Sequence, residues 1–247
     1  MRARCRWLGR TVAFVVYMAL AGCTSGPSST GPMPDEVRAT LEAVSVHRLA
    51  FGDNFGTGVH IGGNRILTCR HVIQDGNSVR VDGRFAIFEI LAAGPWDGEG
   101  DSVDDWAIIQ LLAIEIDGPS VMALWRGDQD PGHADVLFKT YFYSGPMTDA
   151  EAYATPITWM QGRLVPAPDE DNTRALLYTE ISDPAPEGGS GGPMFSFDPV
   201  TNDVALRGIY VRAARVHFLG IPLREMLIAC AITDEAADAL ETYGVYD

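Results

Sequence analysis

A serine surrounded by four glycines is the feature that most limits what this chain of 247 residues can fold into. Residues 187–194 read Glu-Gly-Gly-Ser-Gly-Gly-Pro-Met, with the serine at Ser190. Glycine inside a strand or helix costs about 0.5–1 kcal/mol relative to alanine, so packing does not explain this run. Its backbone freedom instead allows a tight turn that points two N–H groups at one place, which is the geometry of an oxyanion hole. By itself the run also fits a glycine-rich hairpin loop.

The first 22 residues have the pattern of an export signal. Four arginines and no acid occur up to Arg10, and an apolar run covers residues 11–21, which is too short to span a membrane comfortably. The run ends in Leu-Ala-Gly-Cys at Cys23, which resembles the lipobox of bacterial lipoproteins. That resemblance implies that residues 1–22 are a lipoprotein signal peptide and that Cys23 carries acyl chains such as palmitate. The alternatives are an ordinary signal peptide and an uncleaved anchor.

A lipidated Cys23 implies a protein of the bacterial cell envelope, held to a membrane by its N-terminal lipid. Residues 23–40 are then expected to form a flexible tether, because their first half is rich in Ser, Thr, Gly and Pro. Removing residues 1–22 takes away four arginines and no acid, which changes the formal net charge from −15 to −19. Nucleic acid is therefore excluded as a partner, since the chain offers no cationic surface for it, and the acidity favours solubility.

Short β segments separated by turns follow the tether. Gly-Gly-Asn at residues 62–64, between two strand candidates, is typical of a hairpin turn. The spacing of the segments predicts an all-β barrel or sandwich, and an amphipathic helix is expected from Pro222 to about Leu240. The strand candidates are residues 55–61, 65–68, 78–81, 84–91, 106–111, 135–141, 158–165, 175–181, 193–197 and 205–211.

Two cysteines, Cys69 and Cys230, lie in the part of the chain expected to fold. An exported protein can form disulfides, but both residues have apolar neighbours, where buried free thiols are equally natural. Free thiols are the preferred interpretation, and a disulfide is the alternative. No CxxC motif and no Cys/His pair has metal-ligand spacing in the sequence, so neither a metal nor another cofactor is expected.

A nucleophilic serine needs a histidine as base and a carboxylate that orients this histidine. Among the five histidines, His71 has the most suggestive context, because it follows the apolar strand candidate 65–68 where the chain turns. Asp105 directly precedes an apolar strand, so its carboxylate can be buried against a histidine. Asp101 and Asp104 are weaker candidates, because neither stands directly before that strand.

Three segments together resemble the chymotrypsin-like (trypsin-fold) serine proteases. Thr-Cys-Arg-His, ending at His71, resembles their Thr-Ala-Ala-His motif; Asp-Trp-Ala, from Asp105, resembles Asp-Ile-Ala; and the run around Ser190 resembles Gly-Asp-Ser-Gly-Gly-Pro. The resemblance implies two antiparallel six-stranded β-barrels with a C-terminal helix. It also implies His71 as general base and then acid, Asp105 as the carboxylate that orients it, and Ser190 as nucleophile. The backbone N–H groups of Gly188 and Ser190 are implied as the oxyanion hole.

The same resemblance implies a single trypsin-like protease domain over residues 41–247. A first barrel is expected over about residues 41–122, a second over about 123–221, and the helix over about 222–241. One departure from the family concerns activation. Its digestive and clotting members pair an aspartate before the serine with a newly cut N-terminus, whereas this chain has Gly189 there. Activation by proteolysis is therefore not expected.

The family's substrate pocket corresponds here to Pro184 and Ala185, and to Val211, Arg212 and Ala213 on the facing strand. These residues describe an uncharged pocket, or one in which Arg212 attracts an acidic side chain. The predicted function is a lipid-anchored serine endopeptidase that acts on protein or peptide substrates. The alternative is a catalytically silent protease-fold lipoprotein that binds a peptide or a partner.

Overall fold

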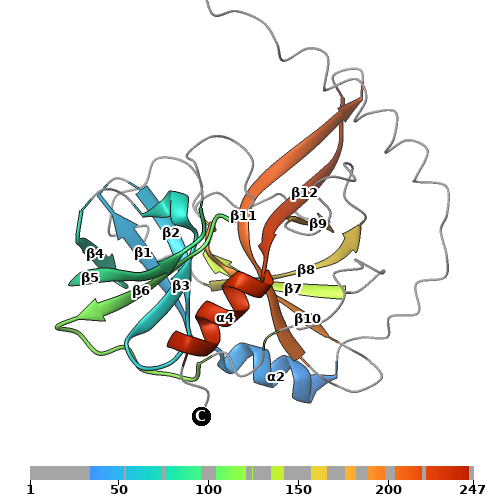
Figure 1. Cartoon of the computed structure of the whole chain (residues 1–247). Coiled ribbons are helices and arrows are strands. Elements are labelled where there is room, and N and C mark those ends of the chain that lie inside the picture. The colour runs from blue at the N-terminus through green and yellow to red at the C-terminus, as the bar shows by residue number, and fades with distance from the viewer. Residues whose placement is uncertain are drawn as a thin grey trace, which may run out of the picture.

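Two closed antiparallel barrels of six strands each make up the described part of the protein (Figure 1). The predicted all-β class with two six-stranded barrels is therefore confirmed. The computed structural model describes residues 34–52, 54–73, 76–95, 104–120, 124, 135–141, 157–165, 176–181, 189–197, 204–218 and 221–244.

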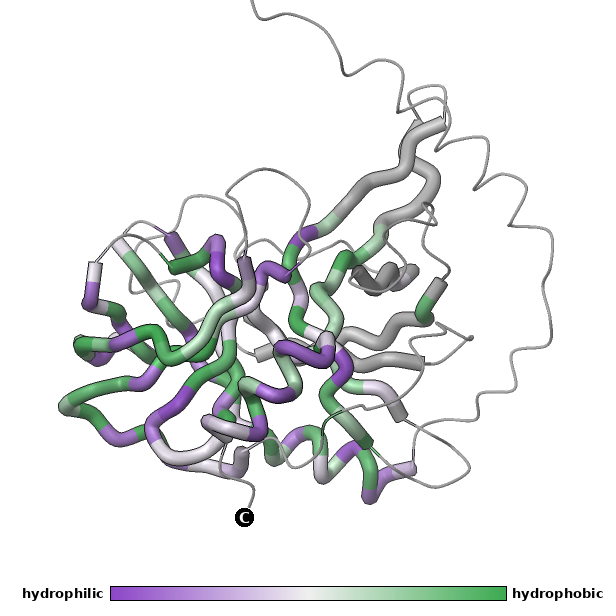
Figure 2. Tube along the Cα trace, in the orientation of Figure 1, coloured by the Kyte–Doolittle hydropathy of each residue, from purple (hydrophilic) through white to green (hydrophobic). Residues whose placement is uncertain are grey.

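The first barrel follows the strand order β1-β2-β3-β6-β5-β4, and β4 closes the barrel against β1. Along β4 exposed and buried residues alternate, as expected for a strand with one face on the core. Figure 2 shows the same mixture of hydrophobic and hydrophilic residues along the strands of this barrel. The bounds are β1 (Val46–Phe51), β2 (Asn54–His60), β3 (Arg65–Thr68), β4 (Ser78–Val81), β5 (Arg84–Ala93) and β6 (Ala107–Leu112). The sequence did not predict β1.

The second barrel follows the order β10-β11-β12-β9-β8-β7, and β7 closes it against β10. Its two longest strands, β11 and β12, pair with each other and form a hairpin that extends beyond the barrel (Figure 1). The bounds are β7 (Asp135–Tyr141), β8 (Ile157–Val165), β9 (Leu176–Ile181), β10 (Pro193–Phe197), β11 (Val204–Phe218) and β12 (Ile221–Ala231).

The expected tether is wrong at its C-terminal end, because helix α2 (Asp35–Ala43) begins inside it. Val37 and Leu41, one turn apart on the helix, are both buried and belong to the hydrophobic core. Asp35 and Glu36 lie in the first turn, where negative charge complements the helix dipole. Two buried apolar side chains therefore hold the helix on the core. The tether was expected because the residues before the helix are small and polar.

The helix predicted from Pro222 to about Leu240 is wrong over its first half. Strand β12 occupies that stretch, and helix α4 (Asp234–Tyr243) begins only after Thr233, whose Oγ1 accepts a hydrogen bond from the Ala236 N–H at 3.4 Å. Residues 226–232 are all buried, and β12 pairs with β11 on one side and with β9 on the other. A strand buried on both faces has a continuous apolar sequence, which periodicity alone does not distinguish from a buried helix.

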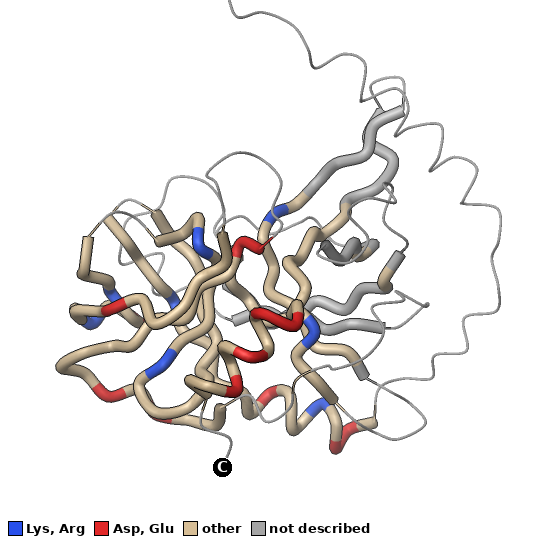
Figure 3. Tube along the Cα trace, in the orientation of Figure 1, with Lys and Arg blue, Asp and Glu red and all other residues tan. Residues whose placement is uncertain are grey.

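Helix α4 returns the chain from the second barrel to the first. Ala236, Ala237 and Leu240 are buried in a core cluster that also contains side chains of the first barrel. At the helix C-terminus the Arg65 guanidinium of β3 donates to the carbonyl of Tyr243. The outer face of α4 is acidic, as the red segments in Figure 3 show. No helix among the described residues is long and apolar enough to cross a membrane.

Two hydrogen bonds to the exposed Asp82 carboxylate link the turn after β4 to strand β1. Asp82 Oδ2 accepts a hydrogen bond from His47 Nδ1 at 2.8 Å, and Asp82 Oδ1 accepts one from the Arg48 backbone N–H at 2.9 Å. Burial raises the pKa of Asp82, but these two hydrogen bonds and the charges of His47 and Arg48 together outweigh burial, and the pKa lies below its usual value. A carboxyl group with a lowered pKa stabilises the fold above the pKa of the unfolded chain, about 3.9, and loses that contribution as the pH falls through the folded-state pKa.

Asp82→Asn is therefore expected to lower the free energy of unfolding by about 1 kcal/mol near neutral pH, a value reduced for the partial exposure of the side chain. Asparagine suits the backbone, because Asp82 has φ 49° and asparagine adopts such left-handed angles readily. Denaturant unfolding in a series from pH 7 to about pH 2 checks this, since the contribution decreases below the pKa of the unfolded chain, about 3.9, and is lost as the pH falls through the lower folded-state pKa. The curves of the two proteins should converge on acidification, and a difference that is independent of pH would contradict the role of the charge.

Candidate active site

The pairing of β3 with β6 brings His71 and Asp105 to the same edge of the first barrel. Thr68, the last residue of β3, pairs with Ala107, the first residue of β6. Because these strands are antiparallel, the residues just after Thr68 and just before Ala107 leave the sheet side by side. His71 then lies on a single 3₁₀ turn, η1 (Arg70–Val72), and Asp105 lies on the segment that enters β6.

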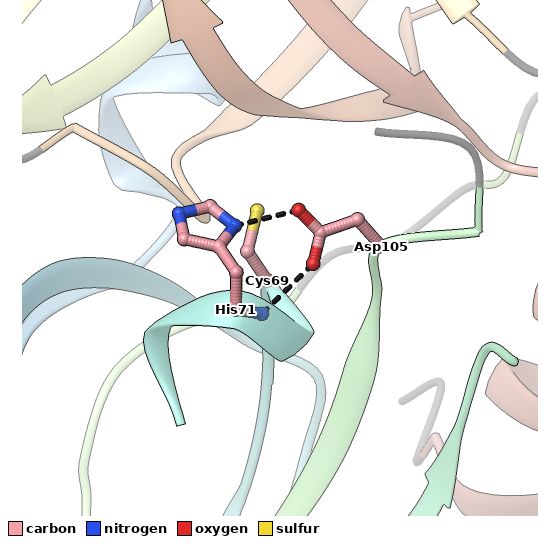
Figure 4. Close-up of side chains that lie close together, drawn as sticks. All are labelled: Cys69, His71 and Asp105. Carbon is pink, nitrogen blue, oxygen red and sulfur yellow. Dashed lines mark hydrogen bonds and ion pairs between the residues drawn. The ribbon is translucent and has the colours of Figure 1, made fainter. Parts of the chain in front are cut away.

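Asp105 holds His71 through two hydrogen bonds (Figure 4). Its Oδ2 lies 2.6 Å from His71 Nδ1, and its Oδ1 accepts the His71 backbone N–H at 2.9 Å. The Asp105 side chain is 2% exposed and the His71 side chain 31% exposed. Since a carboxylate only accepts hydrogen bonds, Nδ1 carries the proton in neutral His71, and Nε2 is left as the basic nitrogen. The arrangement fixes both the orientation and the tautomer of the imidazole.

The neighbouring acid Asp104 has a different role from Asp105. Its backbone has φ 56°, and its carbonyl accepts the Trp106 N–H at 2.9 Å, which makes a tight turn before β6. This turn directs the next residue, Asp105, toward His71. The third candidate, Asp101, lies outside the described residues. Asp105, which the sequence ranked first of the three acids, is hydrogen-bonded to the histidine.

Ser190 lies in a turn that is hydrogen-bonded to both barrels. Its carbonyl accepts the N–H of Thr57, on β2 of the first barrel, at 2.7 Å. The next residue, Gly191, donates its N–H to the carbonyl of Tyr210, on β11 of the second barrel, at 2.7 Å. The Ser190 hydroxyl donates to the carbonyl of Val211 at 2.8 Å. The serine is therefore fixed at the junction of the barrels, with its hydroxyl directed to β11.

Gly56 lies against both the serine turn and the histidine turn. A Cβ at Gly56 would lie 3.0 Å from the carbonyl oxygen of Ser190 and 2.5 Å from a methyl carbon of Val72, the residue after His71. The two segments that carry the serine and the histidine thus approach one glycine of β2. No catalytic role was expected for Gly56, and its place in Gly-Thr-Gly ahead of the histidine was the available signal.

Two buried threonines that the sequence analysis did not select support this junction. The Thr68 hydroxyl donates to the carbonyl of Thr57 at 2.7 Å, and the N–H of Thr57 binds the carbonyl of Ser190. Thr68 is the first residue of the Thr-Cys-Arg-His segment, so its position in that motif was the available signal. The pair connects the strand that leads to His71 with the turn that carries Ser190.

A sequence profile of the trypsin-like peptidase domain matches residues 56–199, which is more than half of the chain and includes His71, Asp105 and Ser190. The chain belongs to the trypsin-like peptidases. Two solved structures of the Rv3671c protease from M. tuberculosis H37Rv, both inactive forms and one a serine-to-alanine mutant, are similar to this peptidase. They are 20% and 19% identical to it, with TM-scores of 0.53 and 0.52, and each match covers 88% of this chain and 98% of the other. At such identities the likeness concerns the fold.

No curated protein matches this trypsin-like peptidase by sequence. Its predicted resemblance to the chymotrypsin-like serine proteases is nevertheless confirmed, because the family profile and the fold of the two solved neighbours agree.

Two free thiols of the peptidase lie close to Asp105. Cys69, between Thr68 and the η1 turn, and Cys230, on β12, are both buried and reduced. Burial, and next the charge of Asp105, raises the pKa of the Cys69 thiol well above its usual value. Burial likewise raises the pKa of the Cys230 thiol to about 12. Both sulfurs are therefore neutral near pH 7, and the Cys69 thiol lies 3.1 Å from the carbonyl of Tyr210 as a hydrogen-bond donor.

The remaining predicted site residues of the peptidase lie partly outside the described chain. Gly188, Pro184 and Ala185 are not among the described residues. On β11 the Val211 side chain is buried, whereas Arg212 and Ala213 are exposed. The structure therefore describes the β11 residues expected at the pocket, Val211–Ala213, but not Pro184 and Ala185.

Proposed function

We propose that the protein is a lipid-anchored serine endopeptidase of the bacterial cell envelope that hydrolyses peptide bonds through an acyl-enzyme. The observation that best supports this is the pair of hydrogen bonds that Asp105 accepts from His71, together with a serine that is fixed between the two barrels. A histidine held in one tautomer by a buried carboxylate is the base that serine catalysis requires.

In the proposed reaction, His71 Nε2 takes the proton of the Ser190 hydroxyl as Oγ attacks the substrate carbonyl. Asp105 stays ionised and stabilises the imidazolium that forms. The Gly188 and Ser190 N–H groups stabilise the negative oxygen of the tetrahedral intermediate. His71 then gives its proton to the leaving amine, which breaks the peptide bond. His71 then takes a proton from water as the water oxygen attacks the ester, and gives this proton to the Ser190 oxygen as the bond between that oxygen and the acyl carbon breaks.

The hydrogen bond between Ser190 and Val211 corresponds to a resting arrangement in this proposal. A hydroxyl group donates one proton, so while it bonds to the Val211 carbonyl it does not donate to His71. Attack requires the Ser190 side chain to turn about its χ1 angle toward Nε2. Because staggered rotamers of exposed side chains exchange within nanoseconds, this rearrangement need not limit the rate.

The same hydrogen bond also fits the alternative, a silent protease-fold lipoprotein that binds a peptide or partner. A fluorophosphonate probe separates the two functions, because it phosphorylates only an activated serine. We expect labelling of the full-length protein at Ser190, found by mass spectrometry of the peptide, and no labelling of the His71→Ala variant. If Ser190 remains unlabelled and no peptide is cleaved, the binding function replaces the enzymatic one.

We propose that the substrate pocket is uncharged at Pro184 and Ala185 and that Arg212 extends the preference to acidic side chains nearby. This rests on the sequence alignment with the family for the first two residues and on the exposure of Arg212 on β11. Cleavage of a peptide library by the unmodified protein and by Arg212→Gln tests it. If the unmodified protein prefers substrates with acidic residues near the cleavage site and the variant does not, the assignment is supported. Unchanged preferences in the variant contradict it.

We further propose that Cys23 is the first residue of the mature protein and carries the lipid. Each buried CH₂ of an acyl chain contributes about 0.8 kcal/mol to membrane binding, so two or three chains make a stable anchor. Cys23→Ala is expected to leave unprocessed precursor or to release protein from the membrane. Fractionation after a high-salt wash and mass analysis of the N-terminus check this, and normal processing with full membrane retention in the variant would contradict lipidation.

A further inference from the structure

Three different metal-binding side chains converge where Asp105 holds the histidine. Cys69 offers a sulfur, His71 a ring nitrogen and Asp105 a carboxylate oxygen, and these atoms lie within 4.8 Å of one another. Among the described residues this is the one group of three such ligands. Figure 4 shows the sulfur beside the ring nitrogen that bonds to the carboxylate. The spacing of Cys and His in the sequence did not predict this group, because the carboxylate of Asp105 belongs to the segment before a different strand, β6.

We propose that Cys69, His71 and Asp105 bind Zn²⁺ and that this metal reversibly inhibits the peptidase. The inhibitory effect rests on the proposed function, whereas the binding site rests on the geometry alone. Zinc prefers thiolate, imidazole and carboxylate ligands, and three protein ligands leave a fourth position for water. Cys69 and Asp105 are buried, so the partly exposed His71 is on the solvent side of the site.

The spacing of the three atoms is close to that of a tetrahedral zinc site. Zinc lies about 2.3 Å from sulfur and about 2.0–2.2 Å from nitrogen and oxygen, which puts the ligand atoms about 3.5 Å apart. The His71 Nδ1 and Asp105 Oδ2 atoms, now 2.6 Å apart, must separate by about an ångström. The sulfur lies within 4.8 Å of both atoms, so it needs to approach them by at most about 1.3 Å.

The thiol is not required by the proposed catalytic reaction. The Thr-Cys-Arg-His segment resembles a family motif that has alanine in place of Cys69. The sulfur contacts the carbonyl of Tyr210 and takes no part in the hydrogen bonds between Asp105 and His71. Cys69→Ala is therefore expected to retain the fold and the basal activity, which makes it a clean test of the metal site.

Zinc on this side of the ring inhibits through the histidine tautomer. When the Zn–S bond forms, the Cys69 thiol releases its proton to solvent. When the metal occupies Nδ1 of His71, the proton that this nitrogen donated to Asp105 is lost, and the neutral ring carries its proton on Nε2 instead. Nε2 then has no free electron pair to accept the Ser190 proton, so the general base is absent although the serine is untouched.

Peptide hydrolysis by the purified full-length protein, measured against increasing Zn²⁺ after removal of metals with a chelator, is the first test. Cys230→Ala is the matched control, because Cys230 is an equally buried thiol near Asp105 that is not in the group of three ligands. The unmodified protein and Cys230→Ala should be inhibited over the same range, and excess chelator should restore activity. In Cys69→Ala the inhibitory concentration should rise at least tenfold, and equal inhibition of all three proteins would overturn the proposal.

A binding measurement that needs no activity separates this proposal from the proposed function. Co²⁺ bound by a thiolate gives a charge-transfer absorption that aquated Co²⁺ lacks. In a Ser190→Ala background we expect this absorption with Cys230→Ala and its loss with Cys69→Ala. If the absorption appears but the unmodified protein cleaves no peptide, the proposed function is wrong and the metal site is supported. If the unmodified protein cleaves peptides but the protein that retains Cys69 gives no absorption with Co²⁺, the proposed metal site is wrong.

Two further measurements test the folding of the variants and the proposed change of tautomer. Thermal unfolding shows whether Cys69→Ala is folded, and Cys69→Ser, whose oxygen is a poor zinc ligand, repeats the test should the alanine variant be unstable. Nitrogen-15 NMR of the imidazole should report the proton of His71 on Nδ1 without metal and on Nε2 with Zn²⁺. A ring that keeps its Nδ1 proton at saturating zinc would overturn the proposed tautomer change.

Discussion

Replacement of Ser190 by alanine is expected to lower kcat/KM for peptide hydrolysis by about 10⁴-fold or more, without unfolding the protein. The hydroxyl makes one hydrogen bond, to the Val211 carbonyl, so its removal costs little stability. His71→Ala and Asp105→Ala should cause losses of similar order, because the base and the group that orients it serve the same step. The three effects should not add in the double variants, since the residues act as one unit.

Ser196→Ala is the matched control for this prediction. Ser196 is a buried serine on β10, close in sequence to Ser190, and its Oγ has no hydrogen-bond partner within the described part of the chain. We expect this variant to keep full activity. Steady-state kinetics with a peptide substrate measure the effect, and circular dichroism verifies the fold of each variant. Full peptidase activity in Ser190→Ala, with no loss relative to Ser196→Ala, would eliminate the serine mechanism.

The arrangement of the histidine and the carboxylate could be predicted because both residues adjoin paired strands. The segments ending at His71 and beginning at Asp105 each adjoin a short apolar strand, and in an antiparallel pair such ends meet. The fold class followed from the regular spacing of strands and turns and from the three motifs. The spacing of strands and turns and the three motifs are each contained in short stretches of sequence, so they can be recognised without a structure.

What the sequence did not reveal depends on contacts between distant segments. Strand β12 was read as a helix because residues 226–232 are all buried and therefore continuously apolar, which hides the period of a strand that pairs with β11 and β9. The role of Thr57 depends on Ser190, far along the chain, and the metal-ligand group requires Asp105 to approach Cys69 from another strand. Such partners are selected by the tertiary fold, so no window of neighbouring residues contains the information.

Gly191→Ala is expected to destabilise the fold by about 3 kcal/mol or more and to lower kcat/KM by about 10²-fold. Gly191 has φ 91°, which an L-residue rarely adopts. A Cβ there would lie 1.9 Å from the carbonyl oxygen of Thr57 and 2.4 Å from Thr68 Oγ1, so the backbone must move. Because Thr57 also holds the carbonyl of Ser190, the nucleophile moves with it.

Gly63→Ala separates the effect of the left-handed backbone angle from the effect of the close contacts that a Cβ would make. Gly63 also has a left-handed φ, 57°, but no atom lies within 4 Å of a Cβ built on it. Its substitution should cost only the backbone strain, about 1–2 kcal/mol, and leave kcat/KM unchanged. Denaturant unfolding and peptide kinetics of both variants measure the difference. Equal losses of stability, with intact activity in both variants, would mean that the backbone angle alone requires glycine at residue 191. A larger loss of stability with reduced activity in Gly191→Ala would show that close contact between the barrels positions the serine.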